Sequence, residues 1–411
     1  MLIDNCMIVK LAWRNIWRNK RRTFITAFSV MLAVFLSVLT RSMQFGSYDK
    51  MIQNIAGTFT GYIQIHQKGY WDEQTLNNSF AQDDSVDHVV ARQTGIKAVV
   101  PRLQSYVLAS GTKSSRAAFV LGIDPKAEND LSEPQKRLIK GQYLTSDNED
   151  GVIIAQGLAD QLQLSVKDTL VLLGQGYHGQ SAAGKYPVKG IVNIPQPDLN
   201  QVLIYLPIQQ ARVLFGAYNR LTAIALVLQK ADMVPQVTKN LRSELPSHYE
   251  VMDWQKMMPE LVQAIQADNA GGLIMLMVLY MIVGFGILGT ILMMTAERKY
   301  ELGIMIAVGM HRFKLGLNIL IESLFMALIG ALAGILISLP VIWYFHLHPI
   351  YLTGDLARGI KTFGMEPIIP FSVDPLILID QALIVFGMTG IIALYPVWYT
   401  FRLKVNTAIR P

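Results

Sequence analysis

Charged residues are scarce in this sequence, and cysteine is almost missing. Only 16% of the 411 residues are charged, whereas 52% are hydrophobic. Soluble chains usually carry about a quarter charged residues. The single cysteine, Cys6, excludes a disulfide within the chain and with it the class of small disulfide-stapled domains. The surplus of apolar residues must therefore lie somewhere other than in an ordinary soluble core.

Motifs that carry chemistry are also lacking. Segment 179–185 has the glycine and lysine spacing of a phosphate-binding loop. Tyr186 and Pro187 follow it, however, where that loop needs a Ser or Thr hydroxyl and the start of a helix. His346 and His348 could share a strand face, but no third metal ligand accompanies them. No Ser-His-Asp arrangement or paired carboxylates in an apolar setting stand out. The sequence therefore predicts no catalytic, cofactor-binding or metal-binding residues, and no enzyme.

Long uncharged runs account for the apolar surplus. Segment 23–40 holds 18 residues without a charge, 269–296 holds 28 and 381–401 holds 21. A fourth apolar run, 315–339, is interrupted only by Glu322. A helix of about 20 apolar residues crosses the hydrocarbon core of a bilayer. We therefore expect four transmembrane helices.

The basic residues gather beside these runs. Thirteen Lys and Arg residues precede the first run or follow the second or fourth, whereas segment 46–268 holds 20 basic and 22 acidic residues. Basic flanks mark the cytoplasmic side of a membrane. Both chain ends and the loop 297–314 are thus expected in the cytoplasm, with 46–268 and 341–380 on the outer side. The net charge of +6 serves topology and contact with membrane lipids, and no nucleic-acid partner is expected.

The predicted fold is a membrane protein of four transmembrane α-helices with a large extracytoplasmic mixed α/β domain inserted between the first and second. Its order is a cytoplasmic amphipathic helix (1–22), the first span with a stalk extension (23–57), the α/β domain (58–253), a stalk helix with the second span (254–296), a cytoplasmic loop (297–314), the third span (315–340), an outer loop (341–380), the fourth span (381–401) and a cytoplasmic tail (402–411). The helical spacing of apolar residues in 43–55 and 254–265 predicts the stalk. Separate surface helices at those places are the alternative.

Within 58–253, short apolar strands alternate with helical periodicity and turn signals. Strands are expected at 61–67, 117–123, 152–155, 169–173, 188–194, 202–206 and 222–229, and helices at 156–163, 207–216 and 231–244. The domain could comprise two lobes, and the residues leave their boundary open.

The third span carries features of close helix packing. Gly330 and Gly334 have the spacing that lets two helix backbones approach each other in lipid. Glu322 is the one ionisable residue well inside a span, and such residues usually face a bundle interior or a polar partner. We expect Glu322 to pair helices or to reach the membrane surface, with a proton or ion relay as the alternative.

The residues after the second span carry a recognisable pattern. They read Thr295-Ala-Glu297-Arg298-Lys-Tyr-Glu301-Leu-Gly303-Ile-Met-Ile-Ala307-Val-Gly309. This stretch resembles the FtsX-like permease domain of MacB-type ABC transporters. The opening Leu11-Ala-Trp-Arg14-Asn15-Ile-Trp-Arg18, together with Gly61-Tyr-Ile-Gln-Ile-His66, resembles permeases of the lipoprotein-releasing (LolC/LolE-type) branch. The resemblance implies a MacB-like periplasmic domain joined to an FtsX-like permease domain.

The resemblance further implies that the 297–314 loop forms a short coupling helix that docks on a separate ATPase. That ATPase (LolD-like) would bind ATP and Mg²⁺, so no cofactor is expected in this chain. The pattern itself is suited to docking, because a plain solvated connector needs no apolar residues. The predicted coupling residues are Glu297, Arg298, Glu301, Leu302, Gly303, Ile304, Ala307 and Gly309.

The function expected from the resemblance is force transmission across a bacterial inner membrane for lipoprotein release. The expected partners are a second permease copy or a paralogue, a lipoprotein substrate and a periplasmic carrier (LolA-like). The resemblance implies that acyl chains enter between the first two spans, where depth and bulk make Phe35, Leu39, Met43, Met277 and Tyr280 candidate groove residues. Ordinary lipid-facing side chains are the alternative. Two alternatives remain: a MacB-like exporter of peptides or amphiphiles with a periplasmic adaptor, and an FtsX-like signalling permease that activates an outer hydrolase.

Overall fold

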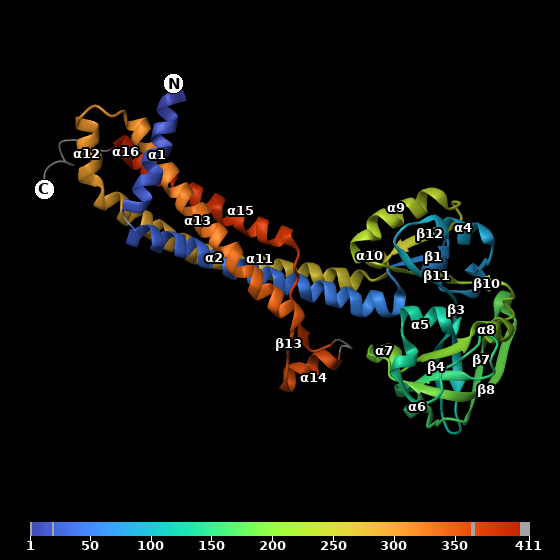
Figure 1. The fold of residues 1–411 in the computed structure, drawn as a ribbon. Helices are drawn as coiled ribbons and strands as arrows, with labels where there is room; N and C mark the ends of the chain where they lie inside the picture. The colour runs from blue at the N-terminus through green and yellow to red at the C-terminus, as the bar shows by residue number, and fades with distance from the viewer. Residues whose placement is uncertain (1, 19, 363–365, 403–411) are drawn as a thin grey trace. The chain divides into compact units, whose positions relative to one another are not determined.

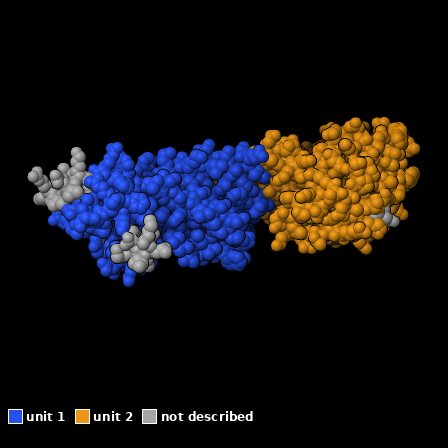
Figure 2. Space-filling model, turned by 90° about the horizontal axis from the view of Figure 1, so that it is seen from above, with its two compact units in different colours: residues 1–49, 264–351, 368–411 blue, residues 50–263, 352–367 orange. Residues whose placement is uncertain are grey.

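The computed structural model describes residues 2–18, 20–362 and 366–402, so the predicted tail beyond Arg402 lies outside the described residues. The chain forms two compact units (Figure 2). Unit 1 contains residues 1–49, 264–351 and 368–411, and unit 2 contains residues 50–263 and 352–367.

Unit 1 is built from helices (Figure 1). They are α1 (Leu2–Arg18), α2 (Lys20–Ile55), α11 (Pro259–Glu297), α12 (Lys299–Ala307), α13 (Arg312–Leu347), α15 (Pro375–Ile392) and α16 (Leu394–Arg402), with the last residues of α2 and the first of α11 counted in unit 2. Among the described residues, four helical stretches are long and apolar enough to cross a membrane: Thr23–Ile55, Pro259–Glu297, Arg312–Leu347 and Pro375–Arg402. The four transmembrane helices predicted from the sequence are confirmed.

The segment after the third span is more ordered than a plain loop. α13 continues through Pro340 to Leu347, past the predicted end at 340, because a spanning helix tolerates proline where neighbouring groups satisfy the freed backbone. Two short strands, β13 (Ile350–Tyr351) and β14 (Ile368–Ile369), then pair antiparallel. Asp374 caps α15 by accepting a hydrogen bond from the backbone N–H of Leu376 at 2.9 Å.

Unit 2 holds a sheet of ten strands in the order β12-β1-β11-β3-β4-β9-β6-β8-β5, with β7 paired to both β3 and β8. The strands are β1 (Ile63–Gln67), β3 (Ile96–Ser110), β4 (Ser115–Ile123), β5 (Leu138–Gly141), β6 (Val152–Ala155), β7 (Thr169–Gln175), β8 (Ser181–Val192), β9 (Leu203–Pro207), β11 (Ala223–Leu228) and β12 (Tyr249–Asp253). A second small sheet pairs β2 (Phe80–Ala81) with β10 (Arg220–Leu221). The mixed α/β domain expected between the first two spans is confirmed.

The remaining elements of unit 2 are short helices. The α-helices are α3 (Tyr70–Glu73), α4 (Asp84–Arg92), α5 (Pro125–Leu131), α6 (Gln156–Leu162), α7 (Pro197–Asn200), α8 (Ile208–Phe215), α9 (Val234–Glu244), α10 (Trp254–Met257) and α14 (Gly354–Thr362). One π-helical turn, η1 (Ala56–Thr60), follows α2 directly, and the 3₁₀ turns are η2 (Leu76–Asn78), η3 (Pro134–Arg137), η4 (Tyr177–Gly179) and η5 (Ala231–Met233).

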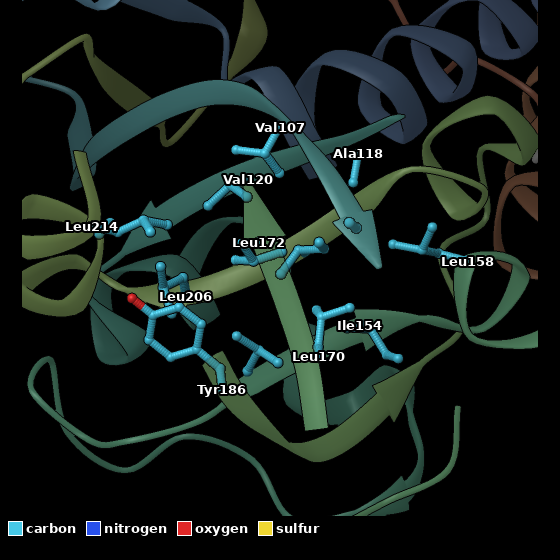
Figure 3. Packing of buried hydrophobic residues seen from close by; sticks show 14 of the residues in the cluster. Val107, Ala118, Val120, Ile154, Leu158, Leu170, Leu172, Tyr186, Leu206 and Leu214 are labelled. Atoms are coloured by element: carbon cyan, nitrogen blue, oxygen red, sulfur yellow. The ribbon is translucent and has the colours of Figure 1, made fainter. Parts of the chain in front are cut away.

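The double pairing of β7 closes six strands into a ring. The pairs run β3–β4, β4–β9, β9–β6, β6–β8, β8–β7 and back to β3. Closure removes free strand edges and encloses the side chains that point inward. Figure 3 shows these side chains converging from the strands of the ring, with Leu158 of α6 and Leu214 of α8 covering them. The strands β1, β11 and β12 extend from β3 outside the ring, which divides unit 2 into a closed barrel and an open sheet.

The structure contains a strand at each of the seven predicted positions and a helix at each of the three predicted ones. The prediction omitted β3, the longest strand, which runs through Pro101. Proline normally argues against a central strand because it cannot donate to the ladder. Here Pro101 pairs with Ile224 of β11 but lies one residue before the pairing with β4 begins at Arg102. The missing N–H therefore removes no bond from the β3–β4 ladder.

Glu149 gives unit 2 a pH-dependent contact. Its carboxylate pairs with Lys189 and accepts hydrogen bonds from the backbone N–H and the hydroxyl of Thr145. Burial alone would raise the pKa of Glu149, but these bonds and the charge of Lys189 outweigh it and lower the pKa to about 2.

We expect Glu149→Gln to reduce the free energy of unfolding by about 1 kcal/mol near neutral pH. A carboxyl with a lowered folded pKa stabilises the fold above its unfolded pKa, and that contribution is lost as pH falls towards the folded value. The deficit of the variant should therefore shrink as pH falls below the ordinary value of 4.5 towards about 2. Denaturant unfolding of both proteins across this range measures it, and a deficit independent of pH would contradict the assignment.

Candidate functional site

A short helix connects the second and third spans. α12 (Lys299–Ala307) begins after Arg298, where the long helix α11 ends. It stops before Gly309, whose φ of +100° lies in the region that favours glycine. The imidazole of His311 then accepts a hydrogen bond from the backbone N–H of Phe313 and caps α13. A helix held between two turns can present a defined face to a partner.

The two sides of α12 differ in burial. Leu302 packs with Leu315 and Ile319 of α13 in one buried cluster, and Gly303 is buried beside it. On the other side Tyr300, Ile304 and Val308 recur every fourth residue and are 55%, 39% and 84% exposed. Residues spaced by four share one helix face. We call these three residues the exposed ridge of α12.

The predicted coupling residues fall on both sides of α12. Glu297, Glu301, Ile304, Ala307 and Gly309 are exposed, whereas Arg298, Leu302 and Gly303 are buried. Tyr300 and Val308 complete the ridge but were not among the predicted residues. Their spacing of four from Ile304 is the signal that could have found them.

Arg298 forms a buried ion pair with Glu322 of α13. Nη1 of Arg298 lies 2.5 Å from Oε2 of Glu322, and Nη2 lies 2.8 Å from Oε1. The two side chains are 8% and 1% exposed. Two parallel N–H···O bonds fix the orientation of a guanidinium against a carboxylate. Arg298, one of the predicted coupling residues, ties the start of α12 to the third span through Glu322.

A second ion pair joins α12 to α1. Nη2 of Arg18 lies 2.9 Å from Oε2 of Glu301, with both side chains more than half exposed. Exposed pairs of this kind contribute little to stability. α1 is held more firmly by Ile16, which is buried against Met294 and Met326, and by the edge of Trp13 on the ring of Phe325.

Gly330 and Gly334 of α13 face α2. A Cβ added at Gly330 would lie 2.5 Å from the carbonyl oxygen of Ala27, and one added at Gly334 would lie 2.7 Å from Cβ of Val34. Both distances are too short for non-bonded atoms, so no larger residue fits without separating the two helices.

We expect Gly330→Leu to destabilise the helix bundle by about 1–3 kcal/mol, because overpacking forces α2 and α13 apart. Thermal unfolding in mild detergent measures the loss. Gly387→Leu on α15 is the matched control, since a Cβ there meets nothing within 4 Å among the described residues. Equal melting temperatures for the two variants would argue against close packing of α13 on α2.

An apolar groove of about 370 Å³ lies between α11 and α15. Its lining is Met277, Tyr280, Met281, Gly284, Phe285, Leu288, Met388 and Ile392. The hydroxyl of Tyr280 donates a hydrogen bond to Gln381 of α15. Two of the predicted groove residues, Met277 and Tyr280, thus line one groove. Phe35, Leu39 and Met43 of α2 are not in its lining; Leu39 packs against the same buried cluster as Tyr280, and Met43 is exposed.

The two sequence motifs that were rejected as functional sites lie in ordinary secondary structure. Segment 179–185 leads into strand β8 rather than into a helix, so it cannot form a phosphate-binding loop. His346 lies in the last turn of α13 and contacts the carbonyl oxygen of Phe371 at 2.8 Å, whereas His348 contacts that of Tyr344. The idea that the two histidines share a strand face is wrong. Within the described ranges, no group of three His, Cys, Asp or Glu could hold a metal ion.

The sequence is similar to one family model and to several known proteins. Residues 273–405 match the family model described as FtsX-like permease C-terminal. The macrolide export ATP-binding/permease protein MacB of Aggregatibacter actinomycetemcomitans is 22% identical over 338 residues, covering 78% of this chain and 50% of that protein. The lipoprotein-releasing system transmembrane protein LolC of Neisseria meningitidis is 21% identical over 335 residues, covering 79% of each chain. The ABC transporter permease YknZ of Bacillus subtilis is 22% identical, covering 81% and 85%.

Solved structures of related outer domains are also similar. The periplasmic region of MacB from Actinobacillus actinomycetemcomitans gives a TM-score of 0.37 at 16% identity, covering 52% of this chain and 98% of that one. The extracellular domain of YknZ gives 0.34 at 16% identity, covering 46% and 99%. The chain spans about half the length of the MacB relative that it matches.

Among the described residues, four helices are long and apolar enough to span a membrane, an α/β domain lies between the first two of them, and a short helix connects the second and third. The match to the FtsX-like permease C-terminal model covers 273–405, about a third of the chain. The chain is similar to ABC-transporter permeases of the MacB/FtsX type.

Proposed function

We propose that this chain is the permease subunit of a transporter powered by a separate ABC ATPase, which docks on the exposed ridge of α12. The observation that carries the proposal is the ridge itself: Tyr300, Ile304 and Val308 form an apolar face on a helix whose opposite side is already packed. An amphipathic helix that lays such a face into a groove is a recurrent mode of recognition. ATP and Mg²⁺ would be held by the ATPase chain.

The buried pair Arg298–Glu322 makes α12 a suitable point for transmitting force. It fixes the first residue before α12 to α13, while Leu302 packs on the same helix. A push on the ridge therefore moves the third span together with α12 instead of bending a flexible loop. Among the described residues, four spans with few charged side chains leave little room for a hydrophilic pore, which favours a mechanical role over a channel.

The sidedness that this function requires follows from the charge distribution. The Lys and Arg residues that flank the spans lie at the two chain ends and in the 297–314 loop, and such residues remain in the cytoplasm. In this arrangement α12 meets the compartment that contains ATP, and unit 2 lies in the periplasm of a bacterial inner membrane.

The substrate class that we propose is a lipoprotein, released from the outer leaflet to a periplasmic carrier (LolA-like) by a complex with a second permease copy or paralogue. The match to the lipoprotein-releasing protein LolC over 79% of each chain supports it, as does the apolar groove between α11 and α15, which has the chemistry to accept an acyl chain. Export of a peptide or amphiphile is the competing function, favoured by the match to MacB.

Purification in mild detergent, followed by mass spectrometry of the bound proteins and acyl chains, tests the proposal. We expect an ABC ATPase together with an acylated protein. If an ATPase and a periplasmic adaptor are found instead, the function is export and not lipoprotein release. If an ATPase and an outer hydrolase are found, the function is signalling. The absence of any ATPase would contradict the proposed function as a whole.

A further inference from the structure

The end of α2 enters unit 2 through one π-helical turn. Lys50–Ile55, the last residues of α2, run directly into η1 (Ala56–Thr60). Ala56 is fully buried, and Phe59 packs on a buried cluster from the barrel strands. π-turns are rare and occur frequently at functional sites. The turn ends at Gly61, whose φ of +79° reverses the chain into β1.

Arg102 of β3 holds this turn. Its side chain is fully buried, and its Nη1 donates a hydrogen bond of 2.6 Å to the carbonyl oxygen of Phe59. Its guanidinium carbon also lies 5.3 Å from the centre of the Phe59 ring, within the range of a cation–π contact. One side chain of the sheet thus binds both the backbone and the ring of Phe59, in the turn that follows the spanning helix.

Glu128 of α5 completes the contact. Nε of Arg102 donates to Oε2 at 2.9 Å and Nη2 donates to Oε1 at 2.6 Å, with both side chains fully buried. The hydroxyl of Ser132 donates a further hydrogen bond of 2.5 Å to Oε1. Burial and the charge of Glu128 raise the pKa of Tyr205, which lies beside Ser132, so that tyrosine stays neutral. The buried charges are therefore balanced and hydrogen-bonded.

We propose that Arg102 and Glu128 form an anchor that passes a displacement of the α2 end into β3 and α5. The anchor rests on the proposed function, in which an ATPase moves the spanning helices. Without the anchor, the π-turn and Gly61 would absorb the displacement of α2. Arg102 and Glu128 are positioning residues: they touch neither substrate nor ATP, and they act through Phe59.

Three features distinguish an anchor from a pair that only stabilises the domain. A fully buried ion pair contributes little net stability compared with apolar side chains of similar size, so stability alone does not explain it. The planar guanidinium of Arg102 donates two hydrogen bonds to Glu128 and a third to Phe59, a geometry that lysine cannot supply. The third bond reaches η1, the only element of this network that continues directly from a spanning helix.

Hydrogen–deuterium exchange of the full chain in detergent tests the anchor. In the double variant Arg102→Met/Glu128→Leu, apolar residues fill the space of the pair. We expect amides 56–60 to exchange about tenfold to a hundredfold faster, because a charge-assisted hydrogen bond to Phe59 is lost. Amides of β6 and β9 should keep their protection. Arg102→Lys, which keeps the charge without the fork, should also release 56–60.

The matched control is Lys189→Met/Glu149→Leu, which removes another ion pair of unit 2. It should leave exchange at 56–60 unchanged. Unchanged exchange at 56–60 in the Arg102/Glu128 variant would overturn the anchor. Loss of protection throughout unit 2 would overturn it as well, since the pair would then be purely structural.

A second readout uses the complex with the ATPase. In the wild-type complex, trapping the ATP-bound state should alter exchange in β3 and α5. In the double variant this response should disappear while the ATPase still co-purifies, because α12 is untouched. A response that persists in the double variant would overturn the anchor. Failure of the ATPase to co-purify with the wild-type chain would instead count against the proposed function. In that case, exchange at 56–60 in the isolated chain would still decide whether Arg102 holds the turn.

Discussion

The double variant Ile304→Glu/Val308→Glu is expected to lose its ATPase partner. Both side chains are exposed, so the substitutions should leave the fold intact. They place two negative charges on the exposed ridge of α12, where an apolar contact is desolvated on docking. Apolar residues at the centre of an interface often contribute more than 1 kcal/mol each, so we expect affinity to fall about a hundredfold or more.

Co-purification and titration with the ATPase measure this loss. Val213→Glu/Tyr218→Glu is the matched control, because it adds the same charges at two exposed apolar positions of unit 2. We expect full association for the control. Equal association for both double variants would show that the ATPase binds elsewhere on the permease.

Removal of one partner of the buried Arg298–Glu322 pair should have the largest effect on stability. Glu322→Ala leaves the guanidinium of Arg298 buried without its carboxylate, which typically costs about 3–5 kcal/mol. We expect a clear fall in the melting temperature of the chain in detergent. Because α12 is then held to α13 by the packing of Leu302 without the ion pair, stimulation of the ATPase should fall as well.

The double variant Arg298→Leu/Glu322→Leu separates the two effects. Replacing both members of a buried pair by apolar residues is often neutral for stability, so the melting temperature should recover. The alternative role of Glu322 as a proton relay makes a different prediction. A relay would abolish transport in Glu322→Gln while leaving stimulation of the ATPase unchanged.

The spanning helices could be predicted from the sequence because their signal is local. An uncharged run such as 269–296 is long enough to cross a bilayer whatever its neighbours are. The glycines at 330 and 334 could be assigned to packing for the same reason, but the partner helix could not. Only the fold shows that they face Ala27 and Val34 of α2.

The barrel of unit 2 could not be predicted, because ring closure depends on β7 pairing not only with its sequence neighbour β8 but also with β3, which lies far from it in the sequence. A strand pattern gives the alternation of side chains but not the partner. The anchor is hidden for a similar reason. Arg102 and Glu128 lie on a strand and a helix 26 residues apart, and no local pattern links either of them to Phe59.

Arg298 illustrates the limit for the candidate site. In a charged stretch that ends a span, an arginine beside two glutamates is indistinguishable by sequence from a residue that faces the solvent. Its partner Glu322 lies 24 residues away on α13. The spacing of Tyr300, Ile304 and Val308, by contrast, is visible in the sequence and identifies the ridge once the length of α12 is known.

An ATPase can dock on α12 only if α12 faces the cytoplasm. The side of the membrane from which Val308 can be labelled tests this requirement most directly. Two variants are made in a chain whose native Cys6 is replaced by serine. The first carries Val308→Cys, at a position that is 84% exposed. The second carries Tyr218→Cys in unit 2. With a membrane-impermeant maleimide, we expect the Tyr218→Cys chain to react in intact cells and the Val308→Cys chain to react only after the inner membrane is opened. Reaction of Val308→Cys in intact cells would place α12 on the side without ATP and contradict the account.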